Sequence, residues 1–220
     1  MDDEAEAKVL LLGDANVGKS VFLRWVGRLA EHSRRLANVI LSVLIRRLDS
    51  RSNVLASDIP SVLRHEDQPY VLELRRPNRS LIRVNFYDTD SPDSYTLLKP
   101  TVIVLCFDTR DRATLQSVYK RWKYEIEAHF NYDEALPVAL LGLKRDEIVQ
   151  AGDAPFGRSN IILAQEALNV AQEMRLDLYA ECSAMTGQTL PQACEDVIKL
   201  AVRSVRAGGG REAASYCSAM

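Results

Sequence analysis

Residues 13–20 read Gly13-Asp14-Ala15-Asn16-Val17-Gly18-Lys19-Ser20 and directly follow the apolar run Lys8–Leu12. The run predicts a short buried strand. The glycines let the chain turn tightly into a helix, with successive N–H groups pointing inward at a phosphate. Lys19 adds a compact positive charge, the Ser20 hydroxyl suits Mg²⁺, and the start of the helix adds partial positive charge. A chance glycine-rich turn is the alternative, but the strand–loop–helix context favours a cradle for the phosphates of a nucleotide.

The composition limits the class of protein. The chain has 220 residues, 47% of them apolar and 26% charged, with 28 basic and 30 acidic side chains. These values are typical of one compact domain with a short tail, and they argue against a disordered chain and a charge-driven nucleic-acid binder. No apolar run reaches the ~18–20 residues of a membrane-spanning helix, and the acidic start is unlike a signal peptide. Four cysteines without a CxxC pair indicate a reducing compartment rather than a disulfide framework.

Apolar runs of strand length alternate with segments of helical period along the chain. The predicted strands are Lys8–Leu12, Tyr70–Arg75, Leu81–Tyr87, Thr101–Phe107, Pro137–Leu143 and Leu178–Glu181. The predicted helices are Ala113–Phe130, Ile161–Met174 and Leu190–Val205. Residues 76–79 favour a turn, so the strands on either side form an antiparallel hairpin. This order predicts an α/β fold: a mostly parallel six-stranded sheet with the hairpin at its edge and helices on both faces.

Two segments stand outside this alternation. An arginine-rich insert covers about residues 31–52, and within it Arg34–Arg51 has one apolar and one basic face, which predicts an amphipathic helix. Packing of the apolar face on the domain is the preferred interpretation, and a helix that binds a membrane surface or a partner is the alternative. Residues 207–220 begin with glycines, show no period and predict a flexible tail. The predicted domain therefore covers residues 1–206.

Two short motifs follow the last two predicted strands, at the sheet edge where parallel sheets bind their ligands. They are Leu143-Lys144-Arg145-Asp146 and Glu181-Cys182-Ser183-Ala184. The Asp146 carboxylate can accept hydrogen bonds from N1–H and N2–H of guanine, a donor pair that adenine lacks. The Lys144 stem can lie over the base, and the N–H of Ala184 can donate to its O6. A loop cap is the alternative role for Asp146, but together with the cradle the pattern favours guanine.

The chain resembles the Ras superfamily of small GTPases, and within it the Rho branch, over roughly Lys8–Val205. The resemblance rests on GDANVGKS, Asp88-Thr89, LKRD, ECSAMTGQTL and Arg121-Trp122, and Ile59-Pro60-Ser61-Val62 is similar to the first switch segment. It implies a P-loop G domain with GTP or GDP and Mg²⁺ as cofactors, and a metal site of Ser20, Ser61 and Asp88, with Asp88 acting through a water. The implied nucleotide-binding residues are Gly13, Asp14, Ala15, Asn16, Val17, Gly18, Lys19, Ser20, Ser61, Lys144, Asp146, Ser183 and Ala184.

The chain departs from the family where hydrolysis takes place. Pro92 stands where the family has the glutamine that positions the attacking water, and proline offers neither a polar side chain nor an N–H. Ala15 replaces a cradle glycine, and its methyl crowds the space of an orienting group or an arginine finger. We therefore assign no catalytic residue and predict weak or absent GTP hydrolysis, similar to atypical Rho proteins of the Rnd type. A substitute such as Asp90 or Asp93 is the alternative.

Nucleotide retention is also predicted to differ from that of the family. Leu143 replaces a polar residue of the family and cannot tie its loop to the cradle. Residues 53–58 contain no aromatic side chain to meet the edge of the base. These departures predict fast exchange and, at cellular nucleotide levels, a site mostly loaded with GTP.

The resemblance implies Rho-type effector proteins and exchange factors as partners, in cytoskeletal or polarity signalling, and no nucleic acid. Cys217-Ser218-Ala219-Met220 fits a prenylation box, which together with the basic insert predicts a cytoplasmic protein attached to the cytoplasmic face of a membrane. Three alternatives stay open: an active GTPase completed by an activating protein, an adaptor that binds no nucleotide and, more distantly, an ATP-dependent P-loop kinase.

Overall fold

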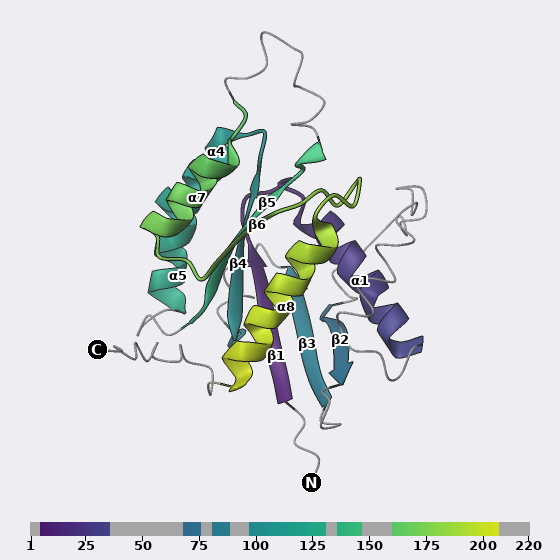
Figure 1. Cartoon of the computed structure of the whole chain (residues 1–220). Helices are drawn as coiled ribbons and strands as arrows, with labels where there is room; N and C mark the ends of the chain where they lie inside the picture. Colours follow the sequence, from purple (N-terminus) through teal and green to yellow (C-terminus); the bar gives the residue numbers. More distant parts are fainter. Residues whose placement is uncertain are drawn as a thin grey trace, which may run out of the picture.

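A twisted sheet forms the centre of the fold (Figure 1). The computed structural model describes residues 5–35, 68–75, 81–88, 97–130, 136–146 and 160–206, and within these ranges six strands pair in the order β2-β3-β1-β4-β5-β6. The strands are β1 (Ala5–Leu12), β2 (Tyr70–Arg75), β3 (Leu81–Asp88), β4 (Val102–Asp108), β5 (Val138–Leu143) and β6 (Leu178–Glu181). β2 pairs antiparallel with β3, and the other neighbours pair parallel.

Helices cover both faces of this sheet (Figure 1). One face carries α1 (Lys19–Arg35) and α8 (Leu190–Arg206). The other face carries α4 (Arg112–Ser117), a π-helical turn (Val118–Trp122), α5 (Lys123–His129) and α7 (Ala164–Glu173). Because successive side chains of a strand point to opposite faces, Val9 and Leu11 pack into the first core, whereas Leu10 and Leu12 pack into the second. Burial on both faces explains why the central strands are continuous apolar runs.

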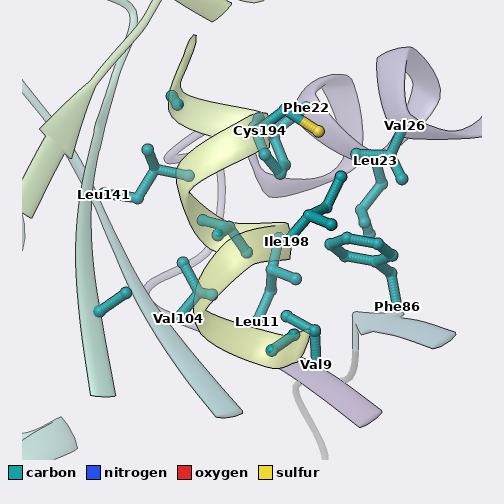
Figure 2. Packing of buried hydrophobic residues seen from close by; sticks show 14 of the residues in the cluster. Val9, Leu11, Phe22, Leu23, Val26, Phe86, Val104, Leu141, Cys194 and Ile198 are labelled. Carbon is teal, nitrogen blue, oxygen red and sulfur yellow. The ribbon is translucent and has the colours of Figure 1, made fainter. Parts of the chain in front are cut away.

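The first of these cores fixes the start of α1. Figure 2 shows Phe22, Leu23 and Val26 of α1 against Phe86 of β3 and Ile198 of α8. All five side chains are at most 1% exposed. Burial of a side chain of this size stabilises a fold by about 1.5–3 kcal/mol. The first turn of α1 is therefore held firmly to the sheet, and with it the end of the loop that joins β1 to α1.

The structure confirms the predicted six-stranded sheet with its antiparallel edge pair. β2 and β6 have the predicted bounds, and the other strands differ by at most three residues at either end. The helix predicted over Ala113–Phe130 is present as contiguous helical turns over Arg112–His129, with a π-helical turn in the middle that the sequence did not predict. None of the described helices is both long enough and apolar enough to cross a bilayer.

The described residues include the start of the predicted insert and none of the predicted tail. Arg34 and Arg35, predicted to begin the insert helix, are the last described residues of α1. Residues 36–52 of the predicted insert and the tail 207–220 lie outside the described residues. The same holds for Ser61, Pro92 and Cys217, so the roles assigned to them stay predictions.

Candidate nucleotide-binding site

The loop between β1 and α1 forms a tight turn that depends on its glycines. Gly13 has φ 148°, and a Cβ atom there would lie 2.4 Å from the carbonyl oxygen of Cys106 in β4, far closer than real side chains come. Asn16 and Gly18 also have positive φ values, 64° and 113°. Such backbone turns are costly for most residues and open to glycine and, less readily, asparagine. The predicted strand–loop–helix cradle is therefore present, with α1 beginning at Lys19.

Lys19 reaches back across this loop. Its Nζ donates hydrogen bonds to the carbonyl oxygens of Gly13 at 2.8 Å and Asp14 at 2.9 Å. The residue is only 5% exposed although it carries a charge. Because a buried charge needs such partners, these contacts fix the ammonium group in one place. That place is the loop in which the sequence predicts the phosphates to lie.

Two of the three predicted Mg²⁺ ligands lie together beside the cradle. The Ser20 hydroxyl donates to Oδ2 of Asp88 at 3.0 Å. Asp88 ends β3 and is 8% exposed. Gln68 holds its backbone from both sides: Nε2 donates to the Asp88 carbonyl oxygen at 2.7 Å, and Oε1 accepts from the Asp88 N–H at 3.0 Å. Hydroxyl and carboxylate oxygens of this kind are ligands that Mg²⁺ prefers.

The residues predicted to read the base come together at the ends of β5 and β6. The Ser183 hydroxyl donates to Oδ1 of Asp146 and accepts from the N–H groups of Met185 at 3.2 Å and Thr186 at 3.1 Å. Ser183 is fully buried, so its hydroxyl is a fixed support that orients the Asp146 carboxylate. Asp146 and the neighbouring Ala184 are half-buried. The structure thus brings Asp146, Ser183 and Ala184 together as the sequence predicts.

Lys144 connects this base loop to the cradle. Its backbone is left-handed, with φ 64°, and its Nζ donates to the carbonyl oxygen of Asn16 at 2.5 Å. Leu143 itself is 1% exposed and packs in the core. The connection of this loop to the cradle comes from the neighbouring lysine, and the sequence did not predict it. The expectation of fast nucleotide exchange stays a prediction.

Two further residues contact the cradle, and the sequence did not predict these contacts. Trp122 ends the π-helical turn and is 2% exposed, as expected of a core residue, but its Nε1 also donates to Oδ1 of Asp14 at 3.0 Å. Arg121 stacks on the Trp122 ring, with Cζ 4.6 Å from the ring centroid, and its Nη1 lies 3.9 Å from the same Asp14 oxygen. The side chain of Asp14 is therefore held by residues on the face of the sheet opposite to α1.

These features define a class of protein. A glycine-dependent loop with a buried lysine, a Ser–Asp pair and an Asp–Ser pair all lie at the carboxyl edge of the parallel strands of one sheet, which is the arrangement of a P-loop nucleotide-binding protein. The comparison with known families is specific. The model of the Ras family matches residues 78–203. The chain therefore belongs to the Ras family, and its relatives place it in the Rho-like branch.

The relatives include several Rho-related proteins. Rho-related GTP-binding protein RhoF of Mus musculus is 25% identical over 134 residues, which cover 57% of this chain and 62% of that protein. GTP-binding protein RHO4 of Saccharomyces cerevisiae is 23% identical over 135 residues, 59% of this chain and 44% of that protein. Rho-related GTP-binding protein RhoV of Rattus norvegicus is 25% identical over 211 residues, 90% of this chain and 75% of that protein. The chain thus spans less than two thirds of the first two.

Proposed function

We propose that this chain is a signalling protein that binds GTP and GDP at the cradle and hydrolyses GTP weakly or not at all. The observation that carries the proposal is the placement of Lys19, the Ser20–Asp88 pair and the Asp146–Ser183 pair along one sheet edge. Lys19 suits phosphates, the Ser20–Asp88 pair suits Mg²⁺, and the Asp146–Ser183 pair suits guanine. Membership of the Ras family and the names of the Rho-related GTP-binding relatives support the same ligand.

Mg²⁺ fits the cradle. Ser20 and Asp88 would hold it, with Ser61 as a further ligand, because the hydroxyl and the carboxylate already lie 3.0 Å apart beside the Lys19 loop. When bound, Mg²⁺ neutralises part of the phosphate charge. Gln68 contributes by fixing the backbone of Asp88, so that the carboxylate is in place before the nucleotide arrives.

Weak hydrolysis follows from two residues. A water that attacks the terminal phosphate must be oriented by a polar group, and Pro92 in the family's glutamine position cannot supply one. Ala15 is exposed on the cradle, so its methyl group occupies space that an orienting group or an arginine finger needs. When turnover is slow, the bound nucleotide follows the cellular ratio of GTP to GDP, and the site is mostly loaded with GTP.

A single-turnover assay tests this part of the proposal. The wild-type chain is loaded with GTP, and release of phosphate is compared with that of Ala15→Gly, Pro92→Gln and the double variant. Because one well-placed orienting group contributes about 100-fold or more to such reactions, we expect slow wild-type turnover and the largest gain in the double variant. Rapid wild-type turnover would show an active GTPase instead. A slow wild type with no gain in the double variant would show that Ala15 and Pro92 are not the cause.

We extend the proposal to partners and location. Rho-like membership supports exchange factors and effector proteins of Rho type, in cytoskeletal or polarity signalling. Prenylation at Cys217 and contact through the arginine-rich insert would hold the protein at the cytoplasmic face of a membrane. One lipid chain gives only marginal binding, so the basic insert would serve as the second signal.

A further inference from the structure

Asp108 stands at the sheet edge that carries the proposed site, but it belongs to none of the motifs described above. It is the last residue of β4, between the ends of β1 and β5 in the sheet order. Its side chain is 9% exposed. A carboxylate so far out of water needs compensating hydrogen bonds, and the identity of its partners indicates what it does.

Both carboxylate oxygens of Asp108 are engaged by cations. Oδ1 accepts from the Arg110 backbone N–H at 3.0 Å and from Arg110 Nε at 3.1 Å. Oδ2 accepts from Arg110 Nη2 at 3.0 Å and from Lys144 Nζ at 2.8 Å. Burial raises the pKa of Asp108, but the hydrogen bonds from Arg110 and Lys144 outweigh it and hold the pKa below its usual value. The carboxylate is therefore ionised at neutral pH.

The contact decides where the Lys144 ammonium group lies. A lysine side chain is long and flexible, and ordering it costs rotamer entropy. Here Nζ is held at once by the carbonyl oxygen of Asn16 in the cradle and by the Asp108 carboxylate. The carbonyl alone is a neutral acceptor, whereas hydrogen bonds between two charged groups are about twice as strong. Asp108 therefore supplies the stronger of the two contacts that hold the Lys144 ammonium group beside the cradle.

We infer that Asp108 is a positioning residue that locks Lys144 onto the cradle and so slows the release of a bound guanine nucleotide. This inference rests on the proposed function. The Lys144 stem spans from the base loop to Asn16, across the edge where the purine would lie, so a nucleotide that leaves must pass a lysine fixed at both ends. Arg110 has a supporting role, because its two-pronged contact keeps the carboxylate turned toward Lys144.

Asp108→Asn tests the inference, because it removes the charge and keeps the shape. The backbone contacts of residue 108 with Thr114 do not involve its side chain and are retained. The measurement is the release rate of fluorescently labelled GDP into excess unlabelled GDP, for wild type, Asp108→Asn, Lys144→Met and the double variant. We expect Asp108→Asn to release GDP about five- to tenfold faster than wild type. In the Lys144→Met background the same change should add less than twofold, because the contact is already lost.

Asp177→Asn is the matched control. The Asp177 carboxylate accepts from the Val138 N–H at 2.9 Å, at the opposite end of β5. The substitution therefore makes the same chemical change far from the site. We expect its release rate to stay within twofold of wild type. Asp108→Ser serves as a second variant should Asp108→Asn not fold, and urea unfolding of each nucleotide-free variant measures any loss of stability.

The outcomes separate the two proposals. Faster release with equal effect in both backgrounds would show that Asp108 acts on general stability, which overturns the inference. Unchanged release in Asp108→Asn also overturns it, while tight GDP binding by the wild type leaves the proposed function intact. A wild-type chain that binds no guanine nucleotide overturns both.

Discussion

Lys19→Met is expected to weaken the binding of GTP by about 100-fold or more, because charge-assisted hydrogen bonds to phosphate contribute about 1.5–3 kcal/mol each. Methionine keeps most of the length of the side chain but brings no charge to the cradle. It also loses the contacts at 2.8 and 2.9 Å with the carbonyl oxygens of Gly13 and Asp14 that hold the loop in shape. Titration with a fluorescent GTP analogue in the presence of Mg²⁺ measures the change.

Lys199→Met is the control for this experiment. Lys199 lies on α8 and pairs with Glu195 at 3.0 Å, and its side chain is 48% exposed. Its loss should leave GTP affinity within twofold of wild type, since exposed pairs contribute little. Binding by Lys19→Met as tight as that of wild type would show that the phosphates lie elsewhere in the molecule.

Asp146→Asn is expected to change the base preference of the site from guanine to xanthine. The carboxylate accepts from N1–H and N2–H of guanine, whereas an asparagine side chain offers one acceptor and one donor. The donor then faces the guanine amino group, and one polar group stays unpaired on each side, which costs about 1–3 kcal/mol per group. We therefore expect GTP affinity to fall about 100-fold and affinity for xanthosine triphosphate to rise, because xanthine presents a carbonyl at that position.

The two nucleotides serve as controls for each other. A variant in which the base loop only unfolds loses affinity for both nucleotides. A variant with a changed base preference loses affinity for GTP and gains affinity for xanthosine triphosphate. Ser183 should support either residue, because its buried hydroxyl can donate to an amide oxygen as it does to the carboxylate. Equal affinity of wild type and Asp146→Asn for GTP would show that Asp146 does not contact the base.

Much of the fold could be predicted because its signals are local. The apolar run Lys8–Leu12 alone predicts a strand that is buried on both faces. In the structure Val9 and Leu11 lie on one face of the sheet, and Leu10 and Leu12 lie on the other. The cradle could be predicted as well, because Gly13 and Gly18 stand at its two ends and Lys19 and Ser20 follow directly. The structure shows why glycine is needed at these positions, where φ is 148° and 113°. The placement of Asp146 and Ser183 at one edge of the sheet followed from a rule on parallel sheets, since both residues come shortly after neighbouring strands. The hydrogen bond between them was not predicted.

The supports of the site could not be predicted, because they join residues far apart in sequence. Trp122 meets Asp14 across 108 positions, and Lys144 meets Asp108 across 36. Side-chain contacts of this kind depend on which helix faces which strand and on how far a side chain reaches. Asp108 did carry one signal, an acidic residue at the end of an apolar strand on the ligand-binding edge. The contact between Lys144 and Asn16 has the same character, since it joins residues 128 positions apart.

The most direct test of the central claim is the identity and amount of nucleotide in the wild-type chain after gentle purification. The chain is denatured, the released nucleotide is separated by chromatography and identified by mass, and its amount is compared with that of the protein. The proposed function predicts close to one guanine nucleotide per chain, most of it GTP, because Lys19 and Asp146 would hold it and hydrolysis would be slow. A chain that is purified empty, and that stays empty in excess GTP and Mg²⁺, would contradict the account.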